Sequence, residues 1–178
     1  ILIKYLEVAD EKKPRSLRVS LLAGKIGAAL GLAKFQVENI KSAALLLEAG
    51  DLRSNIPLYE RVAAYIETES RLADKKLKDK DKILLRTTAS LLKEVEPLLL
   101  AYFYHYVEEA DIQDKDLNNI PIGSSIVALA DLYDRITTGL VAPQWKDKVS
   151  SLEDLHKLSG RAFPQSAVKA LFQVTGAP

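Results

Sequence analysis

Apolar residues recur along this chain with the period of an α-helix, and no stretch alternates apolar and polar residues as a half-buried strand does. The pattern is clear over residues 15–31, where Leu21 and Ile26 share one face and Gly31 suits the helix end. It is equally clear over residues 122–138, whose inner face is apolar. The sequence therefore predicts an all-α fold.

Caps and breakers divide the periodic segments into about seven helices. Asn55, Ser151 and Pro164 are typical of helix starts, and Pro97 predicts a kink. The charged run at 75–82 is expected to be a solvated turn, because its alternating Lys and Asp residues cancel much of each other's field. Helices are expected at 1–8 (the end of an entering helix), 15–30, 36–49, 55–72, 83–109 (one or two helices), 122–138, 151–160 and 164–176, with a polar loop at 111–119.

Composition fits a single globular domain of 178 residues, 48% hydrophobic and 28% charged. We assign residues 1–12 to the end of an entering or linker helix and residues 13–178 to the helical domain. Because the chain begins at Ile1 and contains no Met, we expect it to be an excerpt of a longer polypeptide.

Charge and residue content exclude several classes of function. The 25 Lys and Arg residues nearly balance the 24 Asp and Glu residues, so no global field favours a nucleic acid polymer or an anionic membrane. The absence of Cys excludes disulfides, thiolate metal sites and cysteine nucleophiles. No apolar run is long enough to span a membrane, and no signal peptide precedes the domain, so we expect a cytoplasmic protein.

Few side chains are available for chemistry. The chain has two histidines, His105 and His156, and it lacks both the Gly-x-Ser-x-Gly elbow of a serine hydrolase and a Gly-rich phosphate loop. His156 lies among charged neighbours and is expected at the surface. Asp131 and Asp134 are three positions apart on the inner side of an apolar helix, where a carboxylate is costly unless it is paired or bound.

Two interpretations of these carboxylates stay open. In the first, a residual metal or phosphate site uses His105, Asp131 and Glu48. In the second, which we favour, Asp131 pairs with an arginine. Three arginines are available for that pair: Arg15, Arg18 and Arg86.

The order of the motifs resembles the HD-GYP family, a branch of the HD superfamily of metal-dependent phosphohydrolases. Residues 15–19 (Arg-Ser-Leu-Arg-Val) are similar to the family's His-x-x-Arg-Val, with Arg15 at the position of the ligand His. Residues 43–51 have the frame of Ala-Ala-Leu-Leu-His-Asp-Ile-Gly-Lys, with Leu47 and Glu48 at the His-Asp pair and Asp51 at the final Lys.

The resemblance continues to the end of the chain. The family's His-Pro falls at Arg86 and Thr87, and its His-His-Glu stretch falls near His105. The Gly-Tyr-Pro signature itself is missing. Residues 127–137 are similar to Val-Ala-Asp-Val-Tyr-Asp-Ala-Leu-Thr in matching spacing, which places Asp131 and Asp134 at the two aspartates. Residues 160–164 resemble the terminal Gly-x-x-Phe-Asp-Pro element.

The resemblance implies an HD-GYP-like bundle of about five core helices with further C-terminal helices. Family members hold two or three metal ions that activate water to hydrolyse cyclic di-GMP. Here only Asp131 stands clearly at a ligand position. The resemblance therefore implies a vestigial site made of Arg15, Leu47, Glu48, Asp51, Arg86, His105, Asp131 and Asp134.

The implied function is non-catalytic signalling, as the output or dimerisation module of a bacterial signal-transduction protein. No cofactor is expected, and the partner is another protein or a second copy of the chain. We expect Arg15 and Asp131 to form an ion pair where the family holds metal. One alternative is a cyclic di-GMP phosphodiesterase that binds Fe or Mn through Glu48, His105 and Asp131. Another is a cyclic di-GMP receptor whose phosphate ligands are Arg15, Arg18 and Arg86.

Overall fold

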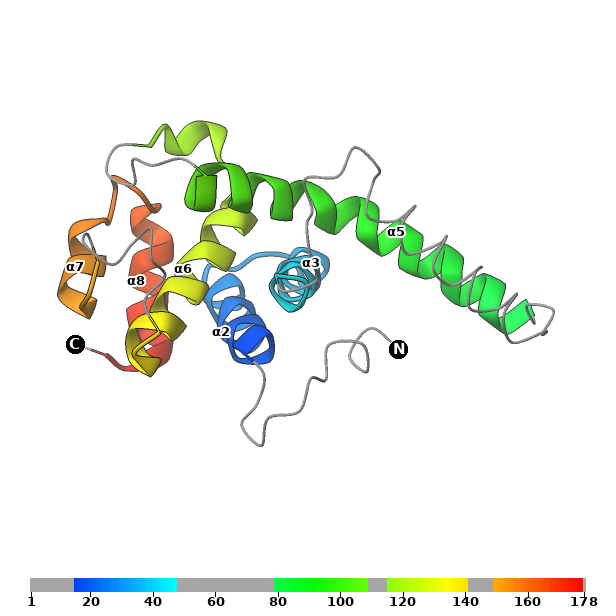
Figure 1. Cartoon of the computed structure of the whole chain (residues 1–178), viewed down its shortest axis with the longest axis horizontal. Helices are drawn as coiled ribbons and strands as arrows, with labels where there is room; N and C mark the ends of the chain where they lie inside the picture. The colour runs from blue at the N-terminus through cyan, green and yellow to red at the C-terminus, as the bar shows by residue number, and fades with distance from the viewer. Residues whose placement is uncertain (1–14, 48–78, 109–114, 141–148, 178) are drawn as a thin grey trace.

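A computed structural model describes residues 15–47, 79–108, 115–140 and 149–177. These residues form six α-helices, one π-helical segment and one 3-10 turn, and they contain no β-strand (Figure 1). The predicted all-α class is therefore confirmed for the described part of the chain. The elements are α2 (Arg15–Ala29), α3 (Lys34–Leu45), α5 (Asp79–Tyr102), η1 (Phe103–Glu108), η2 (Leu117–Asn119), α6 (Ile122–Thr138), α7 (Leu152–Lys157) and α8 (Gln165–Thr175).

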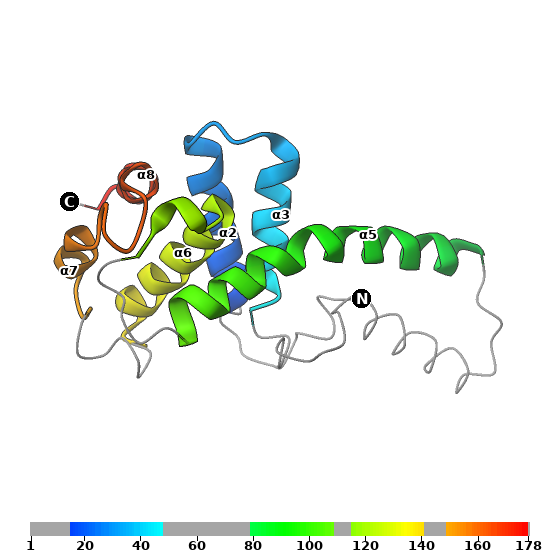
Figure 2. The same ribbon diagram turned by 90° about the horizontal axis from the view of Figure 1, so that it is seen from above.

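Helix α6 lies at the centre of the described helices and contacts α2, α3, α5, α7 and α8 (Figure 2). Every residue from Gly123 to Leu132 is buried, which explains why its apolar pattern is the strongest in the sequence. Its bounds are those that the periodicity predicts. It ends at Gly139, which adopts the left-handed conformation with φ of 73°, and the Leu140 amide then donates to the Arg135 carbonyl at 2.8 Å.

Helices α2 and α3 form a hairpin that packs on α6. The Ser20 hydroxyl donates to the Lys41 carbonyl at 2.9 Å, and a side chain at Gly24 would come within 2.9 Å of the Lys41 side chain. Small residues at these points let the two helices approach closely. Helix α3 ends at Leu45, earlier than predicted, in a turn over residues 46–47.

Helix α5 begins earlier than the sequence indicated. The charged residues 79–82, which we expected in a solvated turn, form its first turn, so that prediction is wrong for these residues. Acidic residues in a first turn complement the helix dipole, so an alternating Asp/Lys run can also start a helix. The helix continues past Pro97 and passes into the π-helix η1, and its N-terminal half extends away from the other described helices (Figures 1 and 2).

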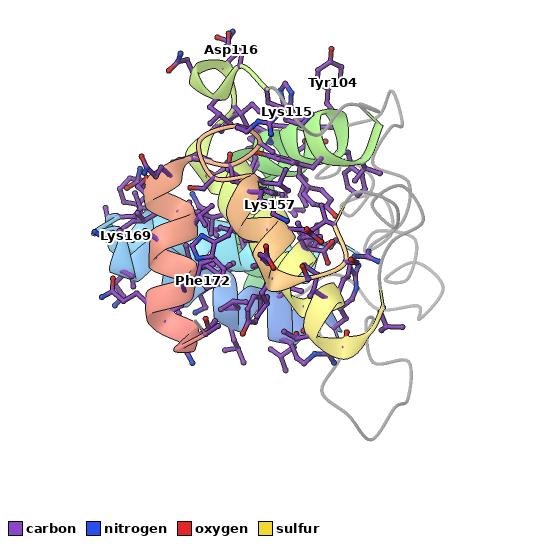
Figure 3. All side chains as sticks on the ribbon, turned by 90° about the vertical axis from the view of Figure 1, so that its left-hand side faces the viewer. Tyr104, Lys115, Asp116, Lys157, Lys169 and Phe172 are labelled. Atoms are coloured by element: carbon purple, nitrogen blue, oxygen red, sulfur yellow. The ribbon has the colours of Figure 1, made fainter. Side chains whose placement is uncertain are left out.

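The C-terminal helices begin where their caps predict. The Ser151 hydroxyl accepts the Asp154 amide at the start of α7, and Pro164 precedes α8. His156 is exposed, as expected, and its ring stacks on that of Phe172 in α8, with the ring centroids 4.2 Å apart. Figure 3 labels Phe172 on α8. This stacking joins α7 to α8.

Several predictions fall outside the described residues. They are the entering helix at 1–8, the division of the chain between residues 12 and 13, and the helix at 55–72. Within the described ranges, none of the helices combines the length and the apolar composition needed to cross a bilayer.

Candidate functional site

Acidic and basic side chains meet where α2 packs against α6. Arg15 and Arg18 lie one turn apart at the start of α2, and Asp131 and Asp134 lie one turn apart on the buried face of α6. Although 116 positions separate them in sequence, Arg15 bonds to Asp131 and Arg18 bonds to Asp134. Arg135 also bonds to Asp131. We call these five residues the arginine–aspartate cluster: Arg15, Arg18, Asp131, Asp134 and Arg135.

Asp131 accepts hydrogen bonds from three side chains and is only 5% exposed. Its Oδ1 accepts from Arg15 Nη1, and its Oδ2 accepts from Arg135 Nε at 2.9 Å and from the Tyr102 hydroxyl at 3.0 Å. The predicted ion pair between Arg15 and Asp131 is therefore present. Arg135 and Tyr102 are partners that the sequence interpretation missed.

Arg18 binds the Asp134 carboxylate through two hydrogen bonds. Arg18 Nε donates to Oδ1 at 2.8 Å and Arg18 Nη2 donates to Oδ2 at 2.9 Å, which is the two-pronged geometry that fits a guanidinium to a carboxylate. Such paired bonds fix both the distance and the orientation of the two groups. Asp134 is 7% exposed, so water screens this pair weakly.

The Tyr102 hydroxyl remains a neutral donor to Asp131. Burial raises the pKa of Tyr102 well above its ordinary value, and the negative charge of Asp131 raises it further, against smaller opposite effects of Arg135 and Arg15. The phenol therefore stays protonated at any physiological pH. Its proton satisfies a lone pair that the two guanidinium groups leave on the Asp131 carboxylate.

The other predicted site residues are dispersed or lie outside the described residues. Leu47, one of the residues of the predicted vestigial site, is buried in the hydrophobic core. Arg86 belongs to α5, but its side chain is not among the described ones. Glu48 and Asp51 lie outside the described residues. His105 belongs to η1, where its ring is half-buried and meets the Tyr104 ring edge-on at 4.8 Å.

A second polar contact joins η1 to the rest of the fold. The Tyr106 hydroxyl lies 2.8 Å from the Ser125 hydroxyl of α6 and donates to the Ala162 carbonyl at 3.2 Å. Its ring stacks on Phe163 at 5.2 Å, and Lys115 Nζ lies 5.7 Å from the ring centroid (Figure 3 labels Lys115). Burial raises the pKa of Tyr106 to about 12. The uncharged Tyr106 side chain therefore connects η1 to α6 and to the Ala162 backbone.

The side chains around Asp131 do not fit a divalent metal. Both carboxylate oxygens already accept bonds from cations, and a metal would have to displace two guanidinium groups that repel it. Leu47, which the sequence resemblance placed in the vestigial site, is a buried hydrocarbon side chain with no lone pair to offer a metal. Across the described ranges, no three His, Asp or Glu side chains gather as a possible metal site.

No family model, no curated protein and no solved structure matches this chain.

Proposed function

We propose that this chain is a catalytically degenerate HD-GYP-like domain that works as a non-catalytic signalling or interaction module. One observation supports the proposal above others: Asp131, which matches a metal-ligand position of the family, is occupied by Arg15 and Arg135. Arg15 itself matches another ligand position. Two positions of the metal site have thus become the two halves of an ion pair.

The energetics favour the loss of metal at this point. A divalent cation about 4 Å from a guanidinium is repelled by roughly 4 kcal/mol per unit charge at an effective dielectric of about 20. Without a metal ion, no hydroxide is available at neutral pH to attack a phosphodiester. The proposed role is therefore binding rather than hydrolysis.

The cluster supplies what a metal site also supplies to a fold, namely a fixed connection between helices. Its bonds join α2 to α6, and Tyr102 adds α5 to the same point. A domain held in this way can transmit a signal through its surface to a protein partner or a second copy of itself. We also propose that this module works in the bacterial cytoplasm.

The same contacts count against a cyclic dinucleotide receptor. Arg15 and Arg18 already donate to Asp131 and Asp134, so a phosphate would have to compete with a buried carboxylate for each guanidinium. They also count against a phosphodiesterase that uses Asp131 as a metal ligand.

Metal analysis tests the proposal most directly. The protein is purified without chelator, loaded with Mn²⁺ or Fe²⁺ and desalted, and its metal content is measured beside that of Asp131→Ala. We expect much less than one ion per chain in both proteins, and no hydrolysis of cyclic di-GMP by either. Stoichiometric metal that Asp131→Ala loses, together with turnover, would overturn the proposal.

Light scattering measures the molar mass of the protein as it elutes from a size-exclusion column, and so tests the interaction role. A concentration-dependent dimer supports self-association. A monomer at all concentrations would remove self-association and leave a different protein as the only proposed partner.

A further inference from the structure

We draw no further inference here: the strongest candidate, the exposed apolar tip between α2 and α3 that carries Phe35 beside Lys34, is a surface patch for which nothing in the described part of the chain shows what covers it.

Discussion

Two groups of ion pairs in this protein share their chemistry and differ in their surroundings. In the arginine–aspartate cluster, the side chains of Asp131 and Asp134 are 6% and 9% exposed. On α7, Lys157 lies 3.4 Å from Glu153 and 3.1 Å from Asp154, but the lysine side chain is 62% exposed and that of Glu153 is 81% exposed. The cluster carboxylates are thus shielded from water, although their arginines are 18–31% exposed, whereas Lys157 and Glu153 are mostly exposed and Asp154 is 27% exposed.

The difference determines what each group can hold together. Water and salt weaken an exposed pair, and the α7 pairs connect residues only three or four positions apart, so they act within one helix. The cluster connects residues 116 positions apart. Removing an aspartate there takes a buried acceptor from the arginines bound to it, and removing an arginine takes a cation from a buried carboxylate, and both changes are costly. We therefore expect the fold to depend on the cluster and to tolerate loss of the α7 pairs.

The largest effect should come from Asp131→Ala. This change leaves the guanidinium groups of Arg15 and Arg135 and the Tyr102 hydroxyl without their shared acceptor. We expect the free energy of unfolding to fall by on the order of 3–5 kcal/mol. Urea denaturation followed by far-ultraviolet circular dichroism measures it. Glu153→Ala, which removes an exposed acid from an α7 pair, is the matched control and should unfold like the original protein.

A triple variant separates the cost of unpaired charge from the cost of lost contact. Arg15→Met, Asp131→Leu and Arg135→Met together replace the ionic contacts by apolar ones of similar size. We expect this variant to be more stable than Asp131→Ala alone, because it leaves no orphaned charge at Asp131. Equal or lower stability would show that the contacts themselves, and not the unpaired charges, determine the loss.

Arg18→Lys should have the next largest effect. Lysine keeps the positive charge but cannot place two parallel N–H groups on the Asp134 carboxylate, as Arg18 Nε and Nη2 do. We expect a loss of about 1–2 kcal/mol in the same denaturation experiment. Lys157→Arg, at an exposed pair, is the matched control and should be silent. If neither exchange changes the free energy of unfolding, a positive charge alone is sufficient at Asp134, and the two parallel hydrogen bonds do not matter.

Local sequence signals predicted the parts of the fold that depend on a single segment. The apolar inward face of α6 predicted that helix from the sequence alone. Ser151 and Pro164 similarly mark the starts of α7 and α8. The run at 79–82 failed as a signal, because alternating charges are compatible with a solvated turn and with the first turn of a helix.

The site was only partly predictable, because its contacts join segments that are far apart in the sequence. An inward Asp131 requires a partner, and the sequence resemblance predicts Arg15 for that pair among the three available arginines. Arg135 had a usable signal that was overlooked, since it lies four positions after Asp131 on the same helix. Tyr102 had none, because its bond to Asp131 spans 29 positions and depends on how α5 packs on α6. The π-helical turn of η1 is likewise a product of packing that periodicity does not reveal.

Tyr106→Phe should cost less than either change in the cluster. It removes the bonds to Ser125 and Ala162 but keeps the stacked ring on Phe163, so we expect a loss of about 1 kcal/mol in urea denaturation. Tyr104→Phe is the matched control, since Tyr104 is 59% exposed, and it should be silent.

The same tyrosine should make stability depend on alkaline pH. Burial raises the pKa of Tyr106 from 10.0 to about 12 in the folded chain. Because the folded value is the higher one, its contribution is complete below pH 10 and is lost as the pH rises through 12. Phenolate absorbance should show a late-ionising group that is absent from Tyr106→Phe. If the variant titrates like the original protein, Tyr106 is not the buried neutral donor that its contacts indicate.

Lys157→Met should have the smallest effect. The pKa of Asp154 is lowered to about 2, first by the Ser150 amide, then by the Ser151 hydroxyl, and only then by Lys157. Because the folded pKa is below the ordinary 3.8, this contribution is complete at neutral pH and is lost as the pH falls through 2. Lys157→Met should therefore leave Tm at neutral pH unchanged. Carboxyl NMR titration should find the Asp154 pKa still well below 3.8 in Lys157→Met and higher in Ser151→Ala. A return to 3.8 in Lys157→Met, or a clear drop in Tm, would mean that water does not screen the α7 pairs, and exposure would no longer explain why the two groups of ion pairs differ.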